Sequence, residues 1–230
     1  MREYRAIDLF AGIGGIRLGF DQAFDGAMKT VFVSELDGNA QKTYLANFGK
    51  EIDIAGDITI VPESSVPGFD ICLAGFPCQA FSRAGKGMGF EDDYMGRARG
   101  TLFFDVVRVC DEHSPSVIFC ENVKGLVFHD TGRTFNTILD RLSKMGYTAY
   151  YKVLNSRGFG VPQNRERVYI VAFRDDIDSS RFAFPTESSE EGNILDIMEE
   201  DPVHAKYYIS KRYMDTMEER TRRNRSKGNG

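Results

Sequence analysis

The chain has 230 residues, of which 42% are hydrophobic and 27% charged, and its formal net charge is −5 at pH 7. These values are ordinary for a globular protein and allow one large domain, with or without an appendage. The acidic balance does not indicate a nucleic-acid binder as a whole, so a basic binding face would have to be local. No apolar run approaches the roughly 20 residues that span a bilayer, which excludes a membrane span.

The four cysteines, Cys72, Cys78, Cys110 and Cys120, contain no close-spaced pair, which argues against a zinc site or a disulfide framework. We therefore expect a reducing, cytoplasmic compartment. The first residues lead straight into a predicted strand, so no signal peptide is expected. Cys110 and Cys120 lie in apolar segments, and we expect both in the core.

Residues 5–10 predict a first strand, a glycine-rich turn follows at residues 11–15, and apolar residues at helical spacing continue to residue 24. In such a unit, backbone N–H groups and a helix N-terminus meet a ligand at close range. The turn lacks the dinucleotide pattern G-x-G-x-x-G, so this signal is weak by itself. A second strand, at residues 30–34, ends in Glu35, about 20 residues past the glycines, where an acid would accept both ribose hydroxyls of a nucleoside cofactor. The alternative is that Glu35 caps the helix expected over residues 37–48.

A third short strand is expected before Gly56, and Asp57 follows it in a loop. Two interpretations of Asp57 stay open. Its carboxylate would accept the amino group of an adenine, or it is a turn residue whose side chain bonds the local backbone.

Residues 69–74 form an apolar run that predicts a buried strand, and Pro77 stiffens the loop after it. Ligands of open α/β sheets bind at the carboxyl ends of the strands, so Cys78 is placed to react. The alternative is a small hydrophobic filler, the usual role of a free cysteine. Most other cysteine nucleophiles need a histidine as base, and this chain has only three.

Residues 83–100 form a long loop with glycines among basic residues, which predicts a mobile lid over a phosphate backbone; a plain linker is the alternative. A helix is expected over residues 101–112 and a buried parallel strand over residues 116–120. The strand leads into Glu121, which therefore lies at the same sheet edge as Cys78.

A helix is expected over residues 131–145, with Gly146 closing it, and two strands over residues 148–155 and 168–173. Arg165 and Arg167 precede the last strand, and they either project together at a ligand or straddle the sheet in ion pairs. Beyond Pro185 the chain is linker-like, with a short helical pattern at residues 194–199. Residues 218–230 form a charged tail that we expect to be solvated or disordered, with phosphate contact as the alternative.

Five segments occur together in one order: residues 8–15 (DLFAGIGG), 75–82 (GFPCQAFS), 99–104 (RGTLFF), 121–123 (ENV) and 163–168 (QNRERV). In this combination the chain resembles the DNA (cytosine-5)-methyltransferase family, bacterial modification enzymes in particular, over about residues 4–175. The resemblance implies an α/β fold, the Rossmann-like doubly wound sheet of S-adenosylmethionine-dependent methyltransferases. That sheet is mostly parallel, with the last two strands forming an antiparallel edge hairpin.

The resemblance also implies S-adenosylmethionine as methyl donor, S-adenosylhomocysteine as product and no metal. The acceptor would be a cytosine in duplex DNA, and the enzyme would belong to a restriction-modification system. Carried over by motif, the cofactor contacts are Phe10, Ala11, Gly12, Ile13, Gly14, Glu35, Leu36, Asp57, Ile58, Pro77 and Leu102.

In the implied reaction, the thiolate of Cys78 adds to carbon 6 of cytosine, which makes carbon 5 nucleophilic. Glu121 would protonate ring nitrogen 3 if burial keeps it partly protonated. Arg167, or Arg165 as second choice, would hold the carbonyl at ring carbon 2 and favour the thiolate. Asn122 would brace the turn before Cys78, and the base must be flipped out of the duplex. The implied DNA contacts are Gln79, Ser82, Arg83, Lys86, Arg97 and Arg99.

Full-length relatives continue into a target-recognition region and a return segment that completes the catalytic domain, and no later segment here matches the closing motifs. We therefore expect a cofactor-binding and catalytic domain at residues 1–185, and a linker with the start of the target-recognition region at residues 186–230. The remainder would be missing or supplied by a separate chain, and the chain alone, expected to be a monomer, would bind cofactor weakly and methylate poorly. The alternatives are a tRNA cytosine-5 methyltransferase, a nicotinamide-dependent oxidoreductase and an inactive binding module.

Overall fold

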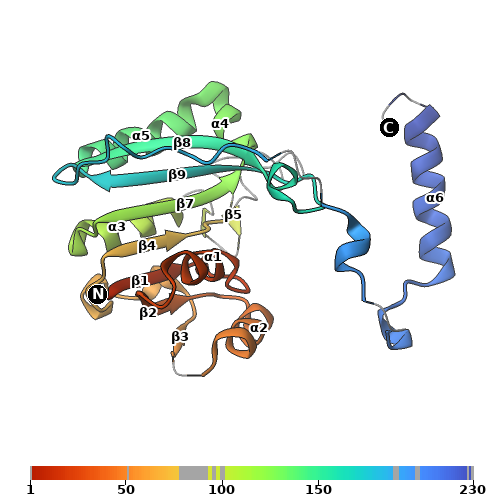
Figure 1. Cartoon of the computed structure of the whole chain (residues 1–230), viewed down its shortest axis with the longest axis horizontal. Helices are drawn as coiled ribbons and strands as arrows, with labels where there is room; N and C mark the ends of the chain where they lie inside the picture. The colour runs from red at the N-terminus through yellow and green to blue at the C-terminus, as the bar shows by residue number, and fades with distance from the viewer. Residues whose placement is uncertain are drawn as a thin grey trace.

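The computed structural model describes residues 2–50, 52–77, 93–94, 97–98, 102–188, 192–199, 203–226 and 228. Its main feature is a seven-stranded sheet of order β3-β2-β1-β4-β7-β9-β8 (Figure 1). The first five strands of this order are parallel, and β9 runs antiparallel to both β7 and β8. The expected mixed sheet with an antiparallel edge hairpin is therefore confirmed. The strands are β1 (Tyr4–Leu9), β2 (Met28–Ser34), β3 (Ile54–Ala55), β4 (Ile71–Ala74), β7 (Val117–Val123), β8 (Tyr147–Asn155) and β9 (Glu166–Arg174).

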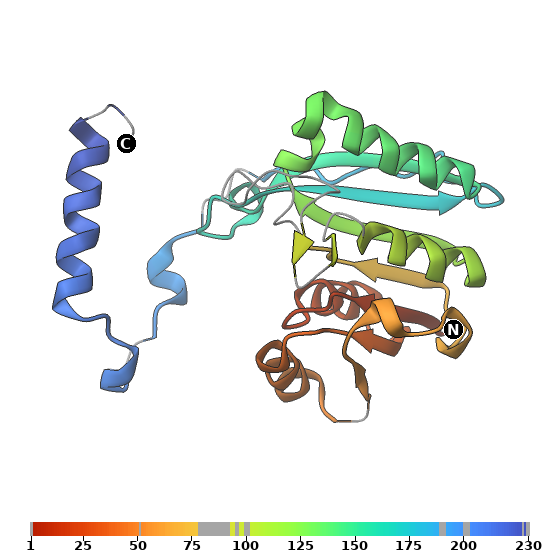
Figure 2. The same ribbon diagram turned by 180° about the vertical axis from the view of Figure 1, so that it is seen from behind.

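Helices cover both faces of this sheet. Helix α1 lies on one face, and α3 and α5 lie on the other, as the two opposite views show (Figures 1 and 2). The apolar stripe of α3 packs into the same core as Ile7 of β1 and Ile118 of β7, and Cys110 and Cys120 are buried in this core as expected. The helices are α1 (Gly15–Phe24), α2 (Gly38–Phe48), α3 (Leu102–His113), α4 (Gly125–Phe128) and α5 (Arg133–Lys144).

The strand order reverses between β1 and β4, which is where an open α/β sheet forms its ligand crevice. Leu9 is paired with Ala74 at the carboxyl ends of these two strands, and the Gly75 N–H donates to the Leu9 carbonyl at 3.2 Å. From there the chain leaves β1 into α1, on its way to β2, whereas it reaches β7 from β4 through α3. The glycine turn and the Phe76–Pro77 loop therefore begin side by side.

Short elements occupy several of the predicted loops. The loop predicted at residues 83–100 contains an antiparallel pair, β5 (Asp93–Tyr94) with β6 (Arg97–Ala98), and the rest of the predicted lid lies outside the described residues. Single 3₁₀ turns follow β3, α4 and β8 and recur near the C-terminus. They are η1 (Ile58–Ile60), η2 (Glu63–Ser65), η5 (His129–Gly132), η6 (Ser156–Phe159), η7 (Ile194–Ile197) and η8 (Ala205–Tyr207).

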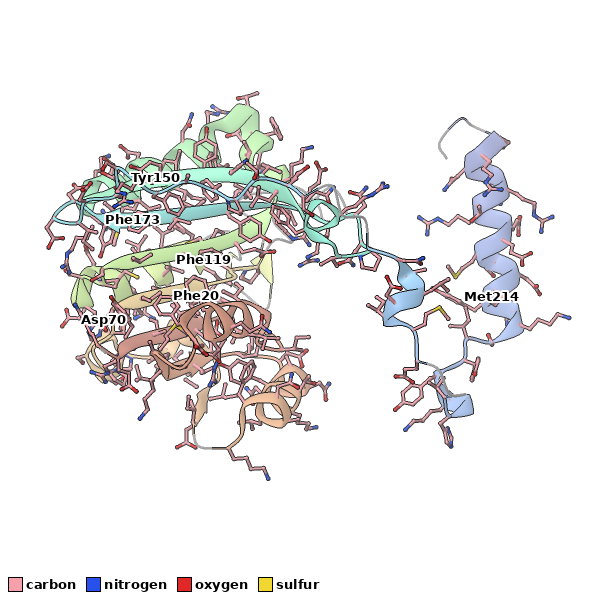
Figure 3. The ribbon with its side chains drawn as sticks, viewed as in Figure 1. Phe20, Asp70, Phe119, Tyr150, Phe173 and Met214 are labelled. Atoms are coloured by element: carbon pink, nitrogen blue, oxygen red, sulfur yellow. The ribbon has the colours of Figure 1, made fainter. Side chains whose placement is uncertain are left out.

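The chain after β9 first packs on the sheet and then leaves it. Phe182 lies against Tyr150 and Phe173, with ring centroids 5.3 and 5.1 Å apart, and these two partners are labelled in Figure 3. Helix α6 (Lys211–Ser226) stands apart from the sheet (Figure 1). Residues 218–226 of the expected tail are exposed, but they belong to this helix.

Good helix formers and charge pairs explain the α6 helix. The carboxylate of Glu219 accepts from Arg223 at 3.0 Å, and Glu218 lies 3.9 Å from Arg222, each pair being one turn apart in the stabilising order. The spacing of these opposite charges favours a helix where a solvated or disordered charged tail was expected. Within the described ranges, no helix is long and apolar enough to cross a membrane.

Candidate cofactor and active site

The glycine turn after β1 is held in an unusual backbone conformation. Phe10 has a φ of 56°, in the left-handed region that a bulky residue rarely adopts, and such strain is found mostly at functional sites. Gly14 has a φ of 89°, and a Cβ there would lie 2.2 Å from the ring of Phe48. The turn therefore requires glycine at position 14, because α2 packs directly against it.

Glu35 joins the glycine turn to the start of α2. Its carboxylate accepts from the Gly12 N–H and from the Asp37 N–H, both at 2.7 Å. The N-cap of α2 is Asp37, which accepts from the N–H groups of the two residues that follow Gly38. The cap interpretation of Glu35 is therefore wrong, because the next acid in the chain fills that position. Glu35 is instead fixed beside the backbone of the turn.

A cavity of about 210 Å³ lies at the carboxyl ends of β1, β2 and β4. It brings together most of the residues predicted to contact the cofactor, although they come from five separate parts of the chain. Ala11 and Ile13 line a neighbouring groove, and Gly12 reaches the site through its bond to Glu35. The cavity lining is Phe10, Ser34, Glu35, Leu36, Gly56, Asp57, Ile58, Gly75, Pro77 and Leu102.

Asp57 serves as a turn residue and as part of the cavity wall. Its Oδ1 accepts from the Thr59 N–H at 3.0 Å and from the Thr59 hydroxyl at 2.7 Å, which caps η1. Ile58, directly after it, is buried. The hydroxyl of Ser34 donates to the Gly56 carbonyl at 3.0 Å and ties this turn to β2. The two interpretations of Asp57 therefore do not exclude each other.

Two arginines, Arg165 directly before β9 and Arg167 at its start, converge on Glu121 of β7. The Glu121 Oε1 lies 3.0 Å from Arg167 Nε and 3.6 Å from Arg165 Nη2. The arginines therefore project together and do not straddle the sheet. The Glu121 side chain is 20% exposed and faces two guanidinium groups. The predicted role of Glu121 as an acid required an apolar environment, whereas the structure surrounds its carboxylate with charged groups.

Asn122 connects the ends of β4 and β7. The side chain is buried; its Nδ2 donates to the Phe76 carbonyl at 3.1 Å and its Oδ1 accepts from the Val123 N–H at 2.8 Å. The predicted brace is confirmed as far as Phe76. The predicted nucleophile and DNA contacts lie outside the residues whose side chains are described, namely Cys78, Gln79, Ser82, Arg83, Lys86, Arg97 and Arg99.

The remaining cysteines are packed in the core. Cys72, Cys110 and Cys120 are at most 1% exposed. Burial raises the pKa of the Cys72 thiol and of the Cys120 thiol, so both are held in the unreactive neutral form. Among the described residues, no group of three or more His, Cys, Asp or Glu side chains is arranged to hold a metal ion.

Sequence reasoning did not find a buried polar chain beneath the glycine turn. Asp8 of β1 is 1% exposed, and burial raises the pKa of its carboxyl to about 7. Its Oδ2 accepts from the Tyr44 hydroxyl at 3.3 Å, and that hydroxyl accepts from Arg17 at 3.1 Å. The Arg17 guanidinium also lies 4.2 Å from the centroid of the Phe48 ring. This series of hydrogen bonds connects β1, α1 and α2 around the turn.

A groove of about 660 Å³ opens beside the cavity, between α1 and strands β7 and β9. Phe20 of α1 and Phe119 of β7 both line it and pack edge to face, with ring centroids 5.0 Å apart (Figure 3). Phe10 and Gly75 line both the groove and the cavity, so the two spaces are neighbours. Because Glu121 and Arg165 also line the groove, it connects the glycine turn with the paired charges at the sheet edge.

Solved structures share this fold. The chain superposes on the Dnmt2 methyltransferase of S. pombe with a TM-score of 0.66 at 20% identity, covering 94% of this chain and 65% of that one. It superposes on a Spodoptera frugiperda DNMT2 mutant with a TM-score of 0.72 at 22% identity, covering 90% and 63%. The sheet order of this chain therefore belongs to the same α/β fold class as these solved structures.

Sequence comparison identifies the family within this class. Residues 4–230 match the family model for C-5 cytosine-specific DNA methylases. The chain is 48% identical to the type II methyltransferase M1.ScrFI of Lactococcus lactis subsp. cremoris, over 99% of this chain and 57% of that protein. It is 48% identical to M.HpaII of Haemophilus parainfluenzae, over 99% and 62%. The chain belongs to the C-5 cytosine-specific DNA methylase family and spans about three fifths of the length of these relatives.

Proposed function

We propose that residues 1–185 form the cofactor-binding and catalytic part of an S-adenosylmethionine-dependent DNA (cytosine-5)-methyltransferase of a restriction-modification system. The observation that carries the proposal is the cavity at the switch between β1 and β4. It gathers the strained Phe10, the fixed carboxylate of Glu35 and Asp57 at one sheet edge. Glu121, with its paired arginines, and Asn122 lie at the carboxyl end of β7, which neighbours β4 in the same sheet.

The chemistry of the cavity lining fits S-adenosylmethionine. Two backbone N–H groups orient the Glu35 carboxylate, an acceptor suited to two ribose hydroxyls. Leu36, Ile58 and Leu102 provide apolar walls for a planar base, with Asp57 as the acceptor for its amino group. The cavity has room for the nucleoside, and the methionine end would extend past Phe10 into the groove. The bound cofactor supplies a methyl group carried on a sulfonium.

The proposed reaction assigns the chemistry to Cys78 and the charges at the end of β7. The Cys78 thiolate adds to carbon 6 of a cytosine flipped out of duplex DNA, and carbon 5 then accepts the methyl group. The donor sulfur leaves as the thioether of S-adenosylhomocysteine. Loss of the carbon 5 proton to a base and expulsion of the thiolate then restore the ring. Arg167 and Arg165 stabilise negative charge on the ring carbonyl, and Glu121 contacts ring nitrogen 3. Asn122 supports this assignment because it fixes Phe76, two residues before Cys78.

We also propose that the enzyme is completed by a further segment, equivalent to the part of the relatives that this chain does not match. That segment would lie on this polypeptide or on a separate one. In this proposal residues 186–230 are the linker and the start of the target-recognition region. Two surfaces support it. Ile13 of the glycine turn lines the open groove and is 59% exposed, Leu18 of α1 is 49% exposed, and the C-terminal segment exposes further apolar side chains. These are Ile194, Leu195, Ile197, Met198, Tyr207, Tyr208, Ile209, Tyr213, Met214 and Met217.

The test measures transfer of a labelled methyl group from S-adenosylmethionine to duplex DNA, with tRNA as the alternative acceptor. The chain is assayed alone and mixed with the part of M.HpaII that lies beyond the match. We expect DNA to be methylated and Cys78→Ala to abolish it, while Cys110→Ala, which removes a buried thiol, retains it. Methylation of tRNA in place of DNA, no transfer in either format, or an active Cys78→Ala enzyme would each overturn the proposal.

A further inference from the structure

One cationic side chain far from the reacting groups holds the adenine side of the cavity. Arg108 of α3 donates to the Val61 carbonyl from Nη1 at 2.9 Å and to the Ile58 carbonyl from Nη2. The same guanidinium binds Glu63 at 2.8 Å and Asp105 at 2.9 Å. Its side chain is 26% exposed. One side chain thus engages two carbonyls and two carboxylates.

The segment that Arg108 grips has little regular structure of its own. The preceding strand, β3, is two residues long, and η1 and η2 are single turns. Backbone hydrogen bonds over residues 57–66 join positions three apart, such as Val61 N–H to the Ile58 carbonyl at 3.1 Å. Arg108 reaches across 50 residues of sequence to the same Ile58 carbonyl. It therefore supplies long-range support that the local backbone does not.

The segment that Arg108 binds, residues 58–63, and helix α3 border the same cavity. Asp57 and Ile58 line the cavity from the η1 side, and Leu102 lines it from the first turn of α3. Arg108 donates to the carbonyl of Ile58 itself. It therefore fixes the positions of Ile58 and of the adjacent Asp57 carboxylate relative to Leu102. A lysine has one point charge and cannot bind two carbonyls and two carboxylates in a fixed planar arrangement.

The two neighbouring carboxylates favour the charged form of Arg108 that makes these contacts. Burial lowers the pKa of Arg108, but the carboxylates of Glu63 and Asp105 outweigh it and raise the pKa overall. Arg108 in turn lowers the pKa of Glu63. A second α3 side chain holds the same segment, since the His113 ring lies 3.0 Å from the Glu63 carbonyl oxygen.

We propose that Arg108 is a positioning residue that sets the specificity of the cavity for a 6-aminopurine nucleoside. It does so by holding Asp57 and Ile58 at the distance at which the Asp57 carboxylate accepts the exocyclic amino group. The inference rests on the proposed S-adenosylmethionine site. It extends that site because Arg108 does not line the cavity.

The test compares the affinities of S-adenosylhomocysteine and S-inosylhomocysteine by calorimetry. The inosyl ligand carries a 6-oxo group in place of the amino group, so it presents an acceptor to the Asp57 carboxylate. We expect the wild-type chain to favour the adenosyl ligand by at least about tenfold, as sites built to hydrogen-bond a substrate N–H do. In Arg108→Lys the preference should fall to within about threefold, mainly through weaker adenosyl binding.

Arg174→Lys is the matched control. Arg174 also donates to a backbone carbonyl, that of Ser114, and binds the carboxylate of Asp176 at 2.7 Å, but it belongs to β9 and lies outside the cavity lining. This variant should lose stability and keep the wild-type preference. Glu63→Gln, which loosens the clamp from its half-exposed side, should lower the preference in the same direction and serves if Arg108→Lys does not fold.

The outcomes separate the inference from the proposed function. A wild-type chain that binds neither ligand contradicts the proposed function. A wild-type chain with the expected preference, which Arg108→Lys and Glu63→Gln both retain, contradicts the role of Arg108 alone. An equal loss of affinity for both ligands in Arg108→Lys would also overturn it, since it would show general destabilisation and no effect on specificity.

Discussion

The brace at Asn122 gives a prediction whose size follows from its hydrogen bonds. In Asn122→Ala, the Phe76 carbonyl loses its bond from Nδ2 and the Val123 N–H loses its bond to Oδ1. Asn122 is 2% exposed, so water replaces these bonds poorly. Each buried polar group left without a partner costs about 1–3 kcal/mol, so the two together give a loss of about 2–6 kcal/mol.

The assay is thermal unfolding followed by circular dichroism. For a domain of this size, 1 kcal/mol corresponds to about 2–4 °C, so a loss of about 3 kcal/mol lowers Tm by about 6–12 °C. The control is Asn136→Ala, which removes an exposed asparagine of α5 and should change stability by less than about 0.5 kcal/mol. A Tm of Asn122→Ala within about 2 °C of the wild type would refute the reasoning that this side chain joins the ends of β4 and β7.

Three further predictions concern the turn and the thiols. Burial raises the pKa of Asp8 from 3.8 to about 7, so between these two pH values the native state holds a proton that the unfolded chain has released. The free energy of unfolding therefore falls as pH rises from 3.8 to about 7. Urea midpoints should show this slope in the wild type and a flatter one in Asp8→Asn. Gly14→Ala should lower stability by at least about 2 kcal/mol, because its Cβ meets Phe48 at 2.2 Å, whereas Gly15→Ala, with nothing within 4 Å, should not; equal unfolding midpoints would contradict this. A thiol reagent should modify one cysteine rapidly in the native protein, since the three described cysteines are buried, and Cys78→Ser should remove that fast phase; several fast thiols would contradict the burial.

Much of the site was predictable because it follows from strand ends and local turns. The strand, glycine turn and helix over Tyr4–Leu9 and Gly15–Phe24 have clear apolar periods, and β2 ends directly before Glu35. Since parallel strands bring their carboxyl ends to one edge, residues from β1, β2, β4 and β7 could be placed together without knowing any contact. The predicted brace at Asn122 follows from the same rule.

What could not be predicted depends on pairs of residues far apart in the chain. Nothing local indicates that Tyr44 reaches Asp8, or that Arg108 reaches Ile58, because these contacts arise only when helices pack on the sheet. The arrangement of Arg165 and Arg167 was left open for the same reason. The left-handed Phe10 also escapes prediction, since strain is imposed by the surrounding fold and is not encoded by the residue itself.

The most direct test of the central claim is a calorimetric titration of this chain with S-adenosylmethionine, with NAD as the competing nucleoside cofactor. We predict binding of S-adenosylmethionine alone. Glu35→Ala should weaken it by about 100-fold, because two hydrogen bonds from ribose hydroxyls to a carboxylate are lost. The control Glu112→Ala, an exposed acid on α3, should bind as the wild type does. Binding of NAD, no binding of S-adenosylmethionine, or an affinity unchanged in Glu35→Ala would contradict the account.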